Sequence, residues 1–158
     1  MENKMVASKF AVKGKVKTIK GSILNPEIGG LRFILNPVAT NGEAKSELEL
    51  HLDSRWKKVR AETKSWFVNK TGAYKLGALN TIAVQSDIWI INMLCKDNDF
   101  NYSEQGVATC LKELAKMAKS EKASVHVSSK LIKDMPKLPA LLEDFVVNSG
   151  VSVYYYNE

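Results

Sequence analysis

A nearly continuous apolar run covers residues 88–94 and is broken only by Asn92. Just before it, residues 81–84 alternate apolar and polar side chains, and residues 85–87, Gln-Ser-Asp, have the composition of a turn. A strand buried on both faces gives a continuous apolar run, whereas a strand with one solvent-exposed face alternates. The pattern therefore predicts an outer strand that turns into the central, most buried strand of a covered sheet.

The remaining elements follow from the same periodicities and from turn residues between them. In residues 10–19, lysines alternate with apolar residues, which is typical of an edge strand. A serine at position 103 provides a helix cap. In the first part of the chain we expect an edge strand at 10–19, a short buried strand at 31–35 ending at Asn36-Pro37, a helix from Glu43 closing at Gly72, and the strand pair at 81–96. After these we expect a helix from Ser103, a strand at 123–127, a loop at 128–139, a helix at 141–147 ended by Gly150, and a last strand at 151–156.

The second half of this order alternates strand and helix, with crossovers long enough for parallel connections. The economical arrangement is a three-layer α/β/α sandwich with a mixed, mostly parallel central sheet. With 158 residues the chain fits a single domain, residues 1–158, that buries its own core, and residues 1–9 are expected to be a loose start.

Composition narrows the function classes. The net charge of +6 favours polyanions, whether nucleic acid, nucleotide phosphates or an acidic partner. No apolar run approaches the roughly 20 residues of a membrane span, and the first residues lack a signal peptide's apolar segment. The two cysteines are too few for a disulfide framework, and neither belongs to a metal-ligand spacing. We expect an intracellular, cytoplasmic protein without a metal or cofactor and without membrane contact.

Ligands of open α/β sheets collect outside the carboxyl ends of the strands. The residues from Asn92 to Asp99 are therefore the first candidate site, together with Asn36 at the end of the preceding strand. Cys95 lies beside Lys96, whose charge could lower a thiol pKa, but no histidine stands in a recognisable nucleophilic arrangement. His126, inside a predicted strand, is expected to be a hydrogen-bonded core residue.

In its order of elements the chain resembles a macrodomain, from about Val12 to Tyr156. The resemblance rests on Tyr-Lys-Leu-Gly at 74–77 before the strand pair, on the strand WIINMLCK at 89–96, on the long helix leading to SVHV at 124–127, and on the short helix before VSVYYY. Macrodomains bind ADP-ribose and related nucleotides, and some hydrolyse ADP-ribose from proteins or nucleic acids. The resemblance implies that fold and that ligand.

The same resemblance implies where the ligand would lie. Ser22 takes the place of the family's adenine-binding aspartate. The first glycine-rich loop corresponds to residues 41–47, so that Asn41 and Gly42 would contact the ligand, and the second corresponds to residues 128–134, beginning with Ser128 and Ser129. Side chains stand near the expected glycines in both loops, and we expect them to occupy the pyrophosphate's volume. These positions are Lys45, Glu47, Leu131 and Lys133.

Lys96 matches a lysine of the subgroup that resembles terminal ADP-ribose protein glycohydrolase, and Asp134 matches its aspartate if one residue is skipped. In that subgroup the lysine attacks the anomeric carbon and the carboxylate assists proton transfer. The simpler interpretation is that both are ordinary loop charges.

The leading hypothesis is a divergent, non-catalytic macrodomain-like module that binds ADP-ribose or a related nucleotide weakly or has lost that binding. Its ligand-binding residues would be Ser22, Asn36, Asn41, Gly42, Asn92, Cys95, Ser128 and Ser129. One alternative is an ADP-ribosyl hydrolase that uses Lys96 and Asp134. Another is a basic nucleic-acid-binding or scaffold protein.

Overall fold

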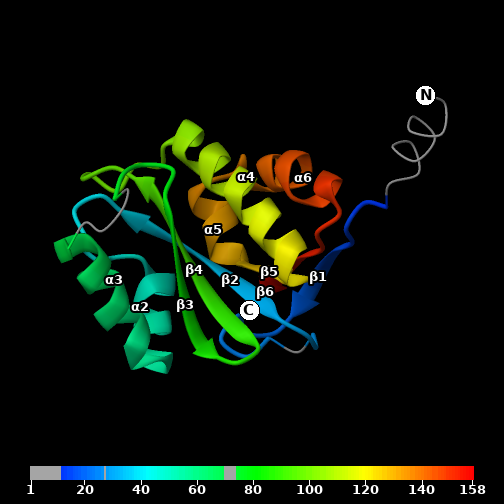
Figure 1. Ribbon diagram of the computed structural model, residues 1–158, viewed down its shortest axis with the longest axis horizontal. Helices are drawn as coiled ribbons and strands as arrows, with labels where there is room; N and C mark the ends of the chain where they lie inside the picture. Colours follow the sequence, from blue (N-terminus) through cyan, green and yellow to red (C-terminus); the bar gives the residue numbers. More distant parts are fainter. Residues whose placement is uncertain (1–11, 27, 70–73) are drawn as a thin grey trace.

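The computed structural model describes residues 12–26, 28–69 and 74–158, and these form a mixed six-stranded sheet (Figure 1). The strand order is β1-β6-β5-β2-β4-β3, and every neighbouring pair is parallel except β3 with β4. The strands are β1 (Val16–Lys20), β2 (Arg32–Ala39), β3 (Leu79–Gln85), β4 (Ile88–Lys96), β5 (Ser124–Ser128) and β6 (Val153–Asn157).

Helices cover both faces of the sheet, so the three-layer α/β/α prediction is confirmed (Figure 1). Two helices, α2 and α3, pack on one face, and α4, α5 and α6 lie on the other. Their bounds are α2 (Glu47–Arg55), α3 (Lys57–Asn69), α4 (Glu104–Glu121), α5 (Ser129–Asp134) and α6 (Leu138–Phe145), and a 3₁₀ turn, η1 (Val147–Ser149), follows α6.

The apolar run at 88–94 lies on β4, where every residue except Trp89 is buried. The prediction of a strand covered on both faces is therefore confirmed. Its place in the sheet differs slightly: β4 lies second from the edge, next to β3, and the two middle strands are β5 and β2. Periodicity reports how well a strand is covered but not how many strands lie beyond it.

The helix expected from Glu43 to Gly72 is two helices. Ser46 caps α2 in a reciprocal pair with Glu49, which explains why the helix begins at Glu47. Trp56 then adopts an extended backbone and separates α2 from α3. The predicted end at Gly72 lies outside the described residues, as do the loose start at 1–9 and the beginning of the strand at 10–19.

The prediction of a loop at 128–139 is wrong. Ser128 caps α5 by accepting a hydrogen bond from the Lys130 amide, and Leu131 anchors this helix in the core. Pro139 lies in the first turn of α6, where a proline's missing N–H costs no hydrogen bond. Serine and proline, taken as loop signals, are here the start signals of two short helices.

Strand β2 also runs past Asn36-Pro37 to Ala39. Proline is tolerated there because β5 pairs with β2 only from Arg32 to Ile34, so that side of the strand carries no ladder beyond this point. Within the described ranges no helix is both long and apolar enough to cross a membrane.

Candidate functional site

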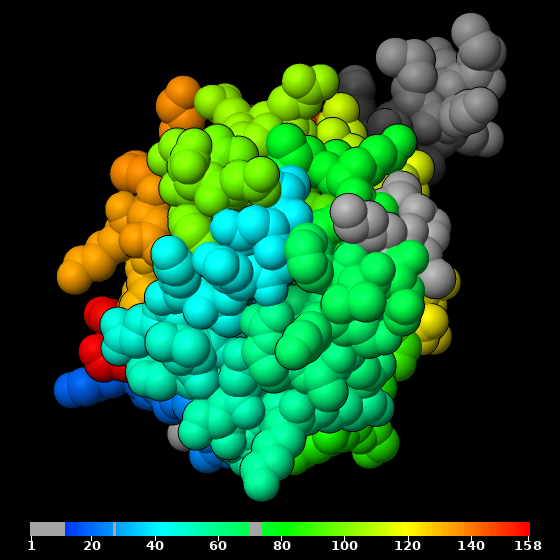
Figure 2. All heavy atoms as spheres, turned by 90° about the vertical axis from the view of Figure 1, so that its left-hand side faces the viewer, coloured from blue at the N-terminus to red at the C-terminus, as the bar shows by residue number. Residues whose placement is uncertain are grey.

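A pocket of about 610 Å³ lies at the carboxyl edge of the sheet, where the parallel strands β2, β4, β5 and β6 end. Figure 2 faces this edge, where the loop after β2 (cyan) meets the loop after β4 (yellow-green), with α5 (orange) beside them. The pocket is lined by Lys45, Ser46, Lys96, Phe100, Asn101, Tyr102 and Asp134. The structure thus brings Lys96 and Asp134 to one pocket.

Lys96 lies at the floor of this pocket and is almost completely buried. Its Nζ is 3.0 Å from Oε1 of Glu49, and the two side chains are only 5% and 3% exposed. Burying two charges is tolerated only when they are paired this closely. The ammonium therefore faces α2 as part of a structural ion pair, with the ring of Tyr102 5.7 Å away.

Tyr102 forms another wall of the pocket. Burial raises the pKa of its hydroxyl well above the usual range, and the charges of Cys95, Asp134 and Glu49 act in the same direction. The phenol is therefore neutral at physiological pH and can donate a hydrogen bond but not act as a base.

The loop after β4 is held in a tight conformation at the mouth of the pocket. The Asp97 carboxylate accepts hydrogen bonds from the amides of Asp99 (2.8 Å) and Asn101 (3.0 Å), which leaves Phe100 at a positive φ of 65°. The ring of Phe100 lies 4.8 Å from the Lys45 ammonium, so a cation–π contact joins the two loops. Within the described ranges, no group of three or more His, Cys, Asp or Glu side chains could hold a metal ion.

The first loop carries Asn41 and Gly42, and both line a neighbouring groove of about 590 Å³ rather than the pocket of Lys96. Gly42 has a φ of 75°, and a Cβ there would clash with the ring of Phe67. Arg60 donates a hydrogen bond to its carbonyl at 2.7 Å. Gly42 therefore serves a tight turn packed on α3. Lys45 borders both the groove and the pocket.

An ion pair connects the two regions that the resemblance assigns to phosphate binding. Lys130 Nζ on α5 lies 2.8 Å from Glu47 Oε1 in the first turn of α2. The hydrogen bond and charge of Lys130 lower the pKa of the Glu47 carboxyl. Each side chain is thus the ion-pair partner of the other, and the contact joins α5 to the first turn of α2.

The second loop is the helix α5, and its residues have other roles than those expected. Ser128 is fully buried and its hydroxyl is used as the helix cap, whereas Ser129 lines a different pocket beside Tyr155. Leu131 is only 2% exposed and points into the core, so it does not fill the pocket as expected. A packed helix has replaced the open loop.

Three expected ligand contacts, Asn36, Asn92 and Cys95, lie inside the protein. Asn36 donates to Asn92 at 2.8 Å, and Asn92 donates to Thr63 of α3 at 2.7 Å. Burial raises the pKa of the Cys95 thiol well above its usual value, which excludes a reactive thiolate. These corrections share one cause: a polar residue near a strand end can face the sheet interior as readily as the edge.

Ser22 lies at the carboxyl end of β1 and is not among the lining residues of the Lys96 pocket. Three strands, β6, β5 and β2, separate β1 from β4. At about 4.8 Å per strand this is a separation of roughly 19 Å. The Ser22 hydroxyl accepts from the Leu24 amide at 3.1 Å, as in a local turn.

Sequence reasoning missed Glu49, Phe100, Tyr102 and Lys130. The spacing Ser46-x-x-Glu49 signals a capping box and could have located the start of α2. Nothing in the local pattern indicates that the same carboxylate reaches across to Lys96, because that contact joins residues 47 positions apart.

No family model matches the chain, and no curated protein matches it in sequence. Solved structures do match in fold. A macrodomain protein from Streptomyces coelicolor superimposes with a TM-score of 0.85 at 20% identity, covering 91% of this chain and 99% of that one. The macrodomain of Mycobacterium tuberculosis DarG superimposes with a TM-score of 0.68 at 15% identity, and the match covers 92% of this chain and 99% of that one.

A third structure, Thermosipho africanus DarTG in complex with ADP-ribose, gives a TM-score of 0.72 at 12% identity. It covers 90% of this chain and 41% of the larger protein. Across these structures the likeness spans nearly the whole chain and reproduces the mixed sheet between two helical layers. This chain therefore has the macrodomain fold.

Proposed function

We propose that this chain is a non-catalytic macrodomain module that binds ADP-ribose or a related nucleotide weakly in the pocket at the carboxyl edge of the sheet. The position of the pocket supports a nucleotide ligand, since open α/β sheets bind ligands outside the carboxyl ends of their strands. The complex of Thermosipho africanus DarTG with ADP-ribose, a protein of similar fold, supports the choice of nucleotide.

The observation that carries the weak affinity is the ion pair between Glu47 and Lys130. A pyrophosphate entering between α2 and α5 has to break this contact and then lie beside the Glu47 carboxylate. Like-charge repulsion from this exposed carboxylate weakens binding, and more so at low salt than at high salt. Backbone amides are also less accessible, because residues 129–134 form a helix instead of a glycine-rich loop.

The contact of Lys96 with Glu49 supports the non-catalytic part of the proposal. An amine attacks carbon only through its lone pair. Here the Lys96 ammonium is directed at Glu49, beneath the pocket rather than into it.

A calorimetric titration with ADP-ribose tests the proposal, with an expected Kd weaker than about 1 mM. Glu47→Gln removes the repulsive charge and should tighten binding about tenfold. Glu113→Gln is the matched control, since it disrupts an exposed ion pair on α4 away from the pocket. Micromolar binding by the unaltered protein, or equal effects of the two variants, would contradict the proposal.

The second candidate function is an ADP-ribosyl hydrolase, and the observation that favours it is the shared pocket of Lys96 and Asp134. Asp134 is exposed, so Asp134→Asn should leave the fold intact. Release of ADP-ribose from a modified protein or nucleic acid, lost in Asp134→Asn, would establish the hydrolase and overturn the non-catalytic proposal.

A further inference from the structure

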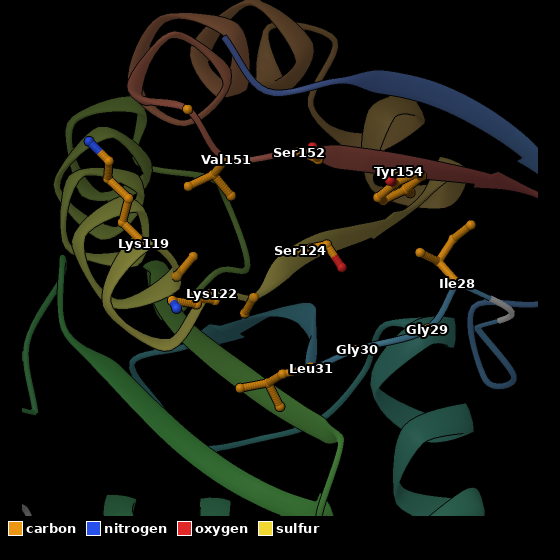
Figure 3. A pocket seen from close by; sticks show the side chains of 13 residues that line it. Ile28, Gly29, Gly30, Leu31, Lys119, Lys122, Ser124, Val151, Ser152 and Tyr154 are labelled. Atoms are coloured by element: carbon orange, nitrogen blue, oxygen red, sulfur yellow. The ribbon is translucent and has the colours of Figure 1, made fainter. Parts of the chain in front are cut away.

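A second pocket lies at the opposite edge of the sheet, at the amino ends of β2, β5 and β6. It has a volume of about 380 Å³ and is enclosed by the loop before β2, the end of α4 and the start of β6. Figure 3 shows Lys119 and Lys122 on one side, Gly29 and Gly30 opposite, and Ser124 between them. The sheet itself separates this pocket from the carboxyl-edge pocket.

The two lysines have no charged partner inside the described part of the chain. Lys119 and Lys122 take part in none of the ion pairs found there. They stand at the carboxyl end of α4, where the helix dipole contributes about half a negative charge. Two ammonium groups outweigh this partial charge together with the one carboxylate of Glu121, so this end of the helix is net positive.

The third polar group is the hydroxyl of Ser124, whose position is fixed by a hydrogen bond to His126. Its Oγ lies 2.7 Å from Nε2 of His126, and Nδ1 of that ring lies 2.7 Å from the Tyr156 hydroxyl. His126 is fully buried and its ring stacks on that of Tyr154, which lines the pocket. The serine hydroxyl is therefore a positioned hydrogen-bonding group at the pocket surface.

The pair Ser124–His126 resembles a nucleophile with its base, but its chemistry favours binding. Burial, with a smaller effect from the charge of Arg32, lowers the pKa of His126 to about 3. A base this weak takes a proton from a serine hydroxyl poorly at neutral pH. The imidazole is instead a neutral, fixed support for the hydroxyl.

Apolar side chains, including Ile28, Leu31 and Val151, complete the walls. A concave site that combines apolar walls with a few convergent polar groups suits a small organic ligand. Two ammonium groups provide donors for an anion with several oxygens, and lysine is a common phosphate ligand. The Ser124 hydroxyl adds a donor in the tautomer in which His126 Nε2–H donates to its oxygen. We propose that this pocket binds a small organic phosphate, with the phosphate against Lys119, Lys122 and Ser124 and the organic part against the apolar walls.

The test is a titration of the ¹⁵N-labelled full chain with phenyl phosphate, followed by NMR. The amides of Gly29, Gly30, Ser124 and Ser152 should shift with a millimolar or tighter Kd, while those of the Lys96 pocket stay unchanged. Benzoate should bind at least fivefold more weakly. No binding, equal binding of benzoate, or shifts confined to the Lys96 pocket would overturn the proposal.

Two double variants with the same change in net charge distinguish binding at this pocket from general electrostatic attraction of phenyl phosphate to the protein. Lys119→Gln with Lys122→Gln should weaken phenyl phosphate binding at least tenfold. Lys112→Gln with Lys116→Gln, on the same helix and with the same change in net charge, should change it less than twofold. Equal weakening by the two double variants would mean that the lysines act only through net charge and would refute a built site.

Ser124→Ala tests the hydroxyl. We expect a three- to tenfold loss of affinity, read beside a thermal melt. A lower Tm with unchanged affinity would show that the hydroxyl only supports the fold, and this would refute its assigned role.

Discussion

The two edges of the sheet use their lysines in opposite ways. At the carboxyl edge, Lys96 is paired with Glu49 and Lys130 with Glu47, so these cations are already committed to the protein's own carboxylates. At the amino edge, Lys119 and Lys122 form no ion pair among the described residues. The two carboxyl-edge lysines are therefore paired within the protein, whereas the two amino-edge lysines carry charges without an ionic partner among the described residues.

This difference shows that a fold and the charges at its edges have separate determinants. The macrodomain architecture depends on apolar burial on both sides of the sheet, which the chain retains. The charges at the carboxyl edge depend on a few side chains, and two of the lysines there contact carboxylates of the protein itself.

The largest expected effect comes from the buried pair at the carboxyl edge. Glu49→Gln leaves the Lys96 ammonium buried without a counter-charge and should lower the free energy of unfolding by about 4 kcal/mol. Urea denaturation measures this. The double variant Glu49→Leu with Lys96→Met should recover most of the loss, because it removes both charges. A loss below about 1 kcal/mol in Glu49→Gln would show that water reaches the pair.

The next effect tests whether α5 is a packed helix rather than a phosphate loop. Leu131→Ala opens a cavity in the core and should cost about 3 kcal/mol in urea denaturation. Lys133→Ala, two residues away and exposed, is the control and should leave stability unchanged within error. Equal stability of both variants would mean that the segment does not pack as described.

A smaller effect should appear with pH at the amino edge. Because the pKa of His126 is about 3 when folded and about 6.5 when unfolded, the unfolded chain binds more protons between these values. Stability is therefore complete above pH 6.5 and falls as the pH drops, by about 2 kcal/mol at pH 5. His126→Asn should flatten this dependence, and His51→Asn, at an exposed site, should preserve it. An unchanged slope in His126→Asn would contradict the assignment.

The sequence predicted the fold well because the relevant signals are local. The run at 88–94 and the cap at Ser103 each depend on near neighbours, and each was located correctly. Gly150 was expected to end the helix at 141–147, and it ends the 3₁₀ turn η1 that follows α6. The short helix α5 was missed, and the helix predicted at 141–147 begins earlier, at Leu138, as α6. In both cases serine and proline serve loops as well as helix starts.

The site was predicted less well, because its contacts are not local. Lys96 and Asp134 do share a pocket, as the resemblance implied. Whether Lys96 faces a ligand or a carboxylate depends on Glu49, which the chain brings close only after α2 has packed on the sheet. The alternation of a strand fixes which residues share a face but not what stands opposite them.

An NMR titration of the ¹⁵N-labelled protein with ADP-ribose tests whether the carboxyl-edge pocket binds this nucleotide weakly. We expect shifts in fast exchange at the amides of Lys45, Ser46 and Asn101, with a Kd weaker than about 1 mM, and no turnover of the ligand. Slow exchange with micromolar affinity would contradict this account, as would the absence of any shift at those amides.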